Sequence, residues 1–252
     1  MADMKRSEKE NLNEENLTEQ EEVEEEILAP QRDDSISKFQ FYIQKYRTYV
    51  ISISIGLIAL IAIFIYVRYN NEANDKKAVL ALSRVLPYFN AKYYDAALKG
   101  DPKAKVRGDE VLGLEYIADE YSGRPAGKVA ALYAGECFIA LGKPAEAKRF
   151  YEIASGSDSR LVVSGANAAL GALAETENNF ESAAKYYTEA AALSLDDAAK
   201  SRYKYFSGLA YEKLGNKEKA ESLYREIIGE TQYSEFTLHA KSGLIRIGTI
   251  IE

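Results

Sequence analysis

The longest apolar run of the chain covers residues 48–67, TYVISISIGLIALIAIFIYV, and contains no charged side chain. A helix of this length rises about 30 Å, the thickness of the hydrocarbon core of a bilayer. It has no polar face, unlike a helix on the surface of a soluble domain. A cleavable signal peptide fits badly, because the apolar core is too long and no small-residue cleavage pattern follows. The run therefore predicts one transmembrane helix.

The segment before this helix differs sharply from the rest of the chain in charge. Residues 1–34 hold 13 Asp and Glu against 4 Lys and Arg, whereas the remaining residues are close to neutral. So few apolar side chains cannot form a core, which predicts disorder; an acidic docking tail for a basic partner is the alternative. Residues 36–47 mix aromatic and basic side chains, as in a helix at the membrane surface. The predicted domains are a disordered acidic tail (1–35), a juxtamembrane and transmembrane helix (36–72) and a repeat domain (73–252).

The beginning of the repeat domain has a helical pattern interrupted by loop residues. Residues 76–99 predict one or two helices, with Pro87 breaking or kinking the first. Glycine and proline between residues 100 and 108 predict a loop. A helix is then expected over about residues 110–121.

From residue 125 onward, small and aromatic residues recur at steps of 36 and 37. Glycine and alanine would let two helices approach closely, and a tyrosine four residues after each alanine would fill the gap to the next repeat. The pattern resembles the tetratricopeptide repeat and implies an all-α fold, a tetratricopeptide-like α-solenoid after the membrane helix. Gly243, 35 residues after Gly208, predicts a terminal capping helix. The recurring positions are Gly135, Gly171 and Gly208, then Ala147, Ala183 and Ala220, then Tyr151, Tyr187 and Tyr224.

The whole arrangement resembles one family of bacterial membrane-anchored proteins. The resemblance is carried by a charged N-terminal segment, one membrane helix, the segments YYDAALKGD and IADEYSGRPAGKVAALYAGECFIALGK, and the repeats. That family includes the ancillary subunit of the Sec translocon and is related to the repeat domain of a cell-division coordinator. The resemblance implies an inner-membrane scaffold with a cytoplasmic N-terminus and a periplasmic repeat domain, whose protein partners are translocon subunits and periplasmic chaperones. A scaffold for cell-envelope or cell-division assembly is the alternative, and the basic residues that flank the helix do not fix the orientation.

A partner groove is expected on the inner face of the first helix of each repeat, by analogy with other tetratricopeptide arrays. Small side chains in the middle repeat between larger apolar ones would leave a trough, and glutamates would give it acidic rims. The expected groove residues are Leu132, Glu136, Ile139, Ala168, Ala172, Glu175, Arg202, Tyr205, Leu209 and Glu212.

The sequence offers little material for catalysis. It has one histidine and one cysteine, Cys137, which is expected to be a buried and inert thiol beside a core aromatic residue. The segment GRPAGKV (123–129) lacks the spacing and the Ser or Thr of a phosphate-binding loop and is expected to start a helix. The repeat domain also lacks the basic stripe of a nucleic-acid-binding protein. We therefore expect no enzymatic activity, cofactor, metal site or small-molecule substrate.

Overall fold

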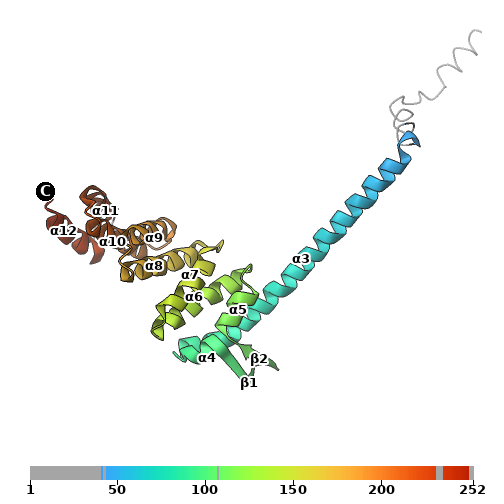
Figure 1. Cartoon of the computed structure of the whole chain (residues 1–252), viewed down its shortest axis with the longest axis horizontal. Helices are drawn as coiled ribbons and strands as arrows, with labels where there is room; N and C mark the ends of the chain where they lie inside the picture. The colour runs from blue at the N-terminus through green and yellow to red at the C-terminus, as the bar shows by residue number, and fades with distance from the viewer. Residues whose placement is uncertain (1–40, 42–43, 107, 231–234, 250–252) are drawn as a thin grey trace, which may run out of the picture. The chain divides into compact units, whose positions relative to one another are not determined.

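The computed structural model describes residue 41 and residues 44–106, 108–230 and 235–249. The predicted acidic tail lies outside these residues. The chain divides into two compact units, with the boundary between Val67 and Arg68. The described part is almost entirely helical, which confirms the all-α prediction, and Figure 1 shows the helices of the second unit following one another along the chain.

The apolar run lies in helix α3 (Arg47–Asn90), which is long and apolar enough to cross a membrane. Every side chain from Ile51 to Asn70 is exposed in the isolated chain. Of the two effects predicted for Pro87, a break is wrong, because α3 continues to Asn90, and a kink stays a prediction. The helix ends where Lys92 adopts a positive φ of 63°. Pro87 lies three residues before the end of α3, so the helix continues for less than one turn beyond it.

A β-hairpin replaces the predicted loop. After helix α4 (Tyr94–Lys99), strand β1 (Gly100–Val106) pairs antiparallel with β2 (Asp109–Leu112). Gly100 has a φ of +81°, and a Cβ there would collide with the backbone of the opposite strand, so only glycine fits at the base of the hairpin. Helix α5 (Leu114–Glu120) follows, four residues later than the predicted start of a helix near residue 110.

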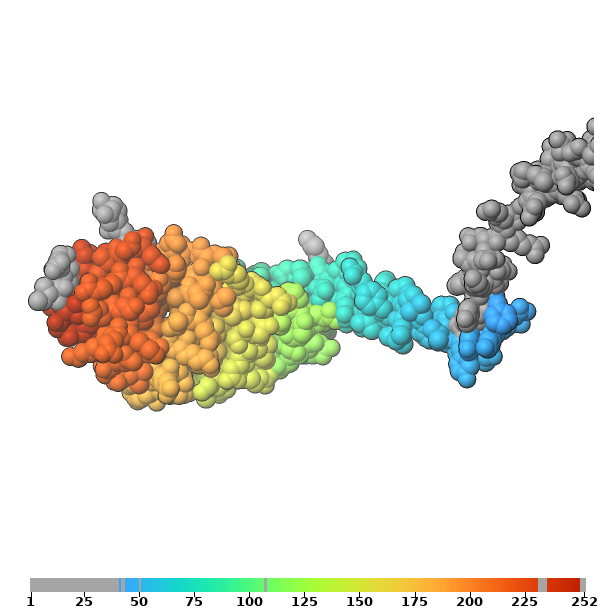
Figure 2. All heavy atoms as spheres, turned by 90° about the horizontal axis from the view of Figure 1, so that it is seen from above, coloured from blue at the N-terminus to red at the C-terminus, as the bar shows by residue number. Residues whose placement is uncertain are grey.

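Three helix pairs form the repeats, as the periodicity predicted. They are α6 (Pro125–Ala140) with α7 (Pro144–Ser155), α8 (Arg160–Thr176) with α9 (Phe180–Leu193), and α10 (Asp197–Lys213) with α11 (Lys217–Glu230). Figure 2 shows their atoms in sequence order, from green to red. Proline at the first position of α6 and α7 suits a helix start, which confirms the prediction for GRPAGKV. A side-chain cap starts α9, where the Oδ1 of Asn179 accepts a hydrogen bond from the Ser182 amide at 3.1 Å.

The recurring glycine and tyrosine of each repeat contact each other. A Cβ on Gly135 would lie 2.5 Å from Cε1 of Tyr151, and one on Gly171 would lie 2.8 Å from Cε1 of Tyr187. The ring of the second helix therefore occupies the space that the glycine of the first helix leaves. The recurring alanines lie four residues before these tyrosines, about one helical turn, and they are fully buried. Each repeat is closed by this ring-on-glycine contact.

The last described helix, α12 (Glu235–Ile247), contains Gly243. Gly208 contacts the tyrosine of the helix that follows it, whereas Gly243 faces backward: its Cβ would lie 2.6 Å from Cε2 of Tyr224. Gly243 therefore does not take the place of Gly208 in a further repeat. The two glycines lie against opposite edges of the Tyr224 ring, which is completely buried.

Candidate interaction surface

All ten predicted groove residues lie on the first helices α6, α8 and α10, and none of them is buried. We call this set the first-helix surface. Glu136, Ile139, Ala172 and Arg202 are exposed, and the other six residues are half-buried. The surface is continuous between at least two helices, because a Cβ on Gly165 of α8 would lie 3.6 Å from Leu132 of α6. The members are Leu132, Glu136, Ile139, Ala168, Ala172, Glu175, Arg202, Tyr205, Leu209 and Glu212.

Two of the three glutamates on this surface hold their own repeat together. Glu175 accepts a hydrogen bond of 2.7 Å from the hydroxyl of Tyr187. Glu212 accepts one from Tyr224 and pairs through both oxygens with Arg246, at 2.7 Å each. Desolvation acts to raise the pKa of Glu212, but the hydrogen bonds from Arg246 and Tyr224 outweigh it, and the pKa is lowered. These two carboxylates are already engaged inside the domain.

Glu136 is the glutamate that remains available on the first-helix surface. Among the described residues it has no hydrogen bond or ion pair, and it is open to solvent. Desolvation nevertheless raises the pKa of its carboxyl group. Glu136 alone therefore contributes the acidic character predicted for the groove.

Tyr205 belongs partly to the core. Its ring contacts Phe206, Tyr224 and Phe236 at a centroid distance of 5.9 Å each, and His239 at 5.4 Å. Such aromatic pairs each contribute about 0.5–1.5 kcal/mol beyond their buried area. Tyr205 therefore joins α10 to α12, so removing it would disturb the fold as well as the surface.

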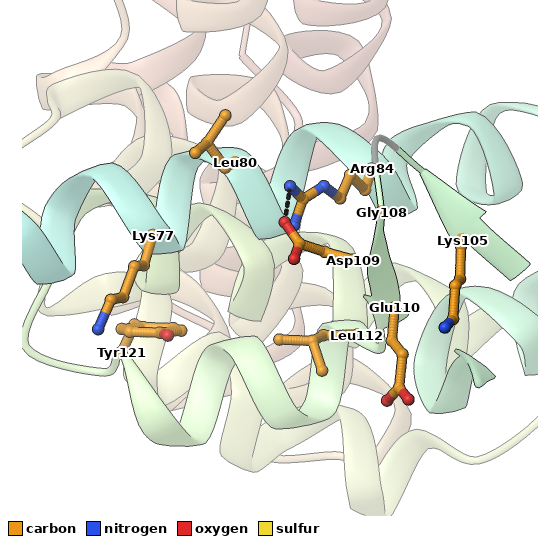
Figure 3. Close-up of a pocket in the computed structure, with 9 residues that line it drawn as sticks. All are labelled: Lys77, Leu80, Arg84, Lys105, Gly108, Asp109, Glu110, Leu112 and Tyr121. Atoms are coloured by element: carbon orange, nitrogen blue, oxygen red, sulfur yellow. Dashed lines mark hydrogen bonds and ion pairs between the residues drawn. The ribbon is translucent and has the colours of Figure 1, made fainter.

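A pocket of about 560 Å³ lies away from this surface, where α3 meets the hairpin and the end of α5 (Figure 3). Leu80, Leu112 and Tyr121 supply its apolar side chains. Arg84 pairs with Asp109 across it at 2.5 Å. Sequence reasoning missed this pocket because it read the hairpin as a loop. The lining residues are Lys77, Leu80, Arg84, Lys105, Gly108, Asp109, Glu110, Leu112 and Tyr121.

Cys137 is buried, as predicted, and it is not in a disulfide. Desolvation, with a smaller contribution from Glu136, raises the pKa of its thiol to about 12. The reactive thiolate is therefore scarce near neutral pH, so Cys137 is not equipped to act as a nucleophile.

Comparison with known families finds one match: the family model of the tetratricopeptide repeat matches residues 201–231. This segment coincides with α10 and α11, the third helix pair. Comparisons with curated proteins and with solved structures find no match. Tetratricopeptide repeats are protein–protein interaction modules, so the fold and this match together indicate an interaction scaffold.

Proposed function

We propose that this protein is a single-pass membrane protein that binds other proteins through the first-helix surface of its repeats. One combination of features carries the proposal. The exposed apolar stretch of α3 precedes three helix pairs, the third of which matches an interaction module, and these pairs leave apolar and small side chains uncovered on their first helices. The large apolar side chains exposed between Ile51 and Val67 would be unstable in water, and a bilayer would cover them.

Within this role, we propose that the protein is an ancillary factor of the protein-export translocon that links it to periplasmic chaperones. The support is the resemblance of residues 40–250 to the membrane-anchored family that contains such a subunit. This assignment places the N-terminus in the cytoplasm and the repeats in the periplasm of the bacterial inner membrane.

Topology provides a first test. Protease added outside spheroplasts should digest the repeats beyond about residue 70 and leave the acidic tail intact, because only the repeats would be accessible. The fragments can be identified with antibodies against each end. Protection of the repeats until the membrane is dissolved would contradict both the orientation and the periplasmic partners.

Substitution of Ala172 tests the binding surface. Ala172 is exposed on α8, so Ala172→Arg should fold normally, with a change in the free energy of unfolding within about 0.5 kcal/mol. The long charged side chain should block a partner that occupies the space above the small residues. We expect partner recovery after photo-crosslinking in membranes to fall about tenfold or more, as for a central interface position.

The matched control is Lys185→Ala, a change on the exposed side of the second helix α9. It should leave both stability and partner recovery unchanged. Full recovery with Ala172→Arg would exclude the first-helix surface as the binding element. Recovery of cell-division or envelope-assembly proteins in place of translocon subunits would keep the scaffold and overturn the export assignment.

A further inference from the structure

Helix α12 exposes two large apolar side chains at the end of the solenoid. Leu238 is 69% exposed and Ile245 is 68% exposed, and they lie two turns apart on one face of the helix. The last helix of a repeat array normally turns a polar face to solvent, because no neighbour covers it. The apolar face of α12 therefore calls for an explanation.

Contacts between successive first helices show which positions of α12 correspond to those of the earlier repeats. Gly165 of α8 approaches Leu132, the residue three positions before Gly135. In the same way His239 of α12 contacts Tyr205, the residue three positions before Gly208. His239 therefore corresponds to Gly165, which lies six residues before Gly171, the recurring glycine of α8. The residue six positions after His239 is Ile245, so Ile245 occupies the position of the recurring glycine in α12, which we call the glycine position.

The same correspondence identifies the exposed face of α12. In α12 the residues four and seven positions before the glycine position are Lys241 and Leu238. In α8 the corresponding residues are Asn167 and Ser164, and both bind the following helix, α9. Asn167 Nδ2 lies 3.3 Å from Glu189, and Ser164 donates a 2.8 Å hydrogen bond to the carbonyl of Ala190.

The third pair uses this face in the same way. In α10 the residue four positions before the glycine is Lys204, which donates to Glu226 at 2.8 Å and to Glu230 at 2.9 Å, both on α11. The exposed face of α12 is therefore the face on which each earlier first helix carries its second helix. Within the part of the chain that the structure describes, no helix covers it.

We propose that this face, Leu238, Lys241 and Ile245, is a second docking site, which receives an amphipathic helix with acidic residues from a partner protein. Charge defines the occupant: Lys241 is exposed and has no ion pair among the described residues, whereas its counterpart Lys204 binds two carboxylates of the helix that covers it. A covering helix with glutamates at these positions would pair with Lys241 and bury Leu238 and Ile245.

The residue at the glycine position further restricts which helix can bind to this face. Gly171 and Gly208 each leave room for a tyrosine ring, whereas Ile245 fills that room with its own side chain. The incoming helix must therefore carry a small residue where the second helices of this chain carry tyrosine. Copies of α7, α9 or α11 do not meet this condition, so a second molecule of the same protein would not dock here through those helices.

The test uses the full-length protein in detergent and a labelled peptide with the sequence of α11, residues 217–230. A hydrocarbon staple on the solvent side holds the peptide helical, and alanine stands in place of Tyr224. Fluorescence anisotropy should show saturable binding of this peptide. The version that keeps the tyrosine should bind about tenfold more weakly, because its ring meets Ile245. In the alanine peptide, replacing Glu226 and Glu230, the two glutamates that bind Lys204 in the third pair, by glutamine should weaken binding about two- to fivefold, the range for an exposed ion pair.

Substitutions in the protein complete the test. Ile245→Asp should abolish binding of the alanine peptide, whereas Leu195→Asp, at a leucine 69% exposed between α9 and α10, should leave it unchanged. Both proteins should keep the same thermal midpoint, since both side chains are exposed. Absence of saturable binding, or equal binding by the Ile245→Asp protein, would overturn the proposal. A shift from dimer to monomer caused by Ile245→Asp would assign the face to a second copy and would also overturn it. Ala172→Arg should leave peptide binding intact, so this site and the first-helix surface can fail separately.

Discussion

Replacing Tyr224 by alanine should lower the free energy of unfolding by about 3–5 kcal/mol, the range for deleting a large buried aromatic side chain. The ring is completely buried, with Gly208 against one edge and Gly243 against the other. Two glycine backbones on adjacent helices cannot collapse into the cavity that the ring would leave. The change would also remove the donor that binds Glu212. Urea unfolding of the full-length protein in detergent, followed by circular dichroism, measures the loss.

Two further variants separate the contributions of the ring and the hydroxyl group. Tyr224→Phe keeps the ring, and Glu212 keeps its two bonds to Arg246, so we expect a loss of about 0.5–1.5 kcal/mol. Tyr116→Ala, at a tyrosine 52% exposed on α5, should change stability by less than about 0.5 kcal/mol. A loss below about 1 kcal/mol for Tyr224→Ala would mean that the ring does not join α10, α11 and α12.

The repeats could be predicted from the sequence because their packing depends on residue size at fixed spacing. Glycine faces tyrosine in each pair, and a change of either would force the helices apart, so the pattern is visible without a structure. The turns follow the same logic: Gly142 and Gly215, just after the first helices α6 and α10, have positive φ values of +72° and +74°, which favour glycine. The helix contacts and the turns therefore depend on the size and backbone preference of single residues, which the sequence shows directly.

The hairpin was missed because its signals are short. Val106 pairs with Asp109, and between them Gly108 has a φ of +90°, which is typical of a tight hairpin turn. The strands themselves are mostly exposed and polar, so they lack the alternation that identifies a strand, and only Val111 is buried. The pocket beside the hairpin depends on how α3 and α5 pack against it, which no local pattern reveals.

The first-helix surface also combines features that could be predicted from the sequence with features that could not. Its ten residues could be placed on the first helices from the repeat spacing alone, and the structure leaves all of them unburied. The engagement of Glu212 with Arg246 could not be foreseen, because it depends on the rotation of α12. Gly243 faces Tyr224 and does not take the place of Gly208. Within the described residues no second helix follows α12, so its glycine position is not restricted to a small residue and is occupied by Ile245.

Gly208→Ala should destabilise the protein by about 1–3 kcal/mol, although alanine is the better helix former. A Cβ at this position would lie 2.6 Å from Cε1 of Tyr224. Real carbon atoms do not approach so closely, and the ring cannot move away because Gly243 lies against its other edge. Gly171→Ala should act in the same direction, since its Cβ would lie 2.8 Å from the Tyr187 ring. The measurement is again urea unfolding of the full-length protein.

Gly165→Ala is the matched control, because it makes the same chemical change on α8 without overpacking. Its Cβ would lie 3.6 Å from the Leu132 side chain, an ordinary van der Waals contact. The helix propensity of alanine should then dominate and stabilise the protein by about 0.5–1 kcal/mol. The expected result is thus a reversal of sign between glycines of one fold: Gly208→Ala and Gly171→Ala lose stability, while Gly165→Ala gains it. Stabilisation by all three substitutions would mean that the tyrosine rings do not rest on the glycines, and the explanation given for the repeat spacing would be wrong.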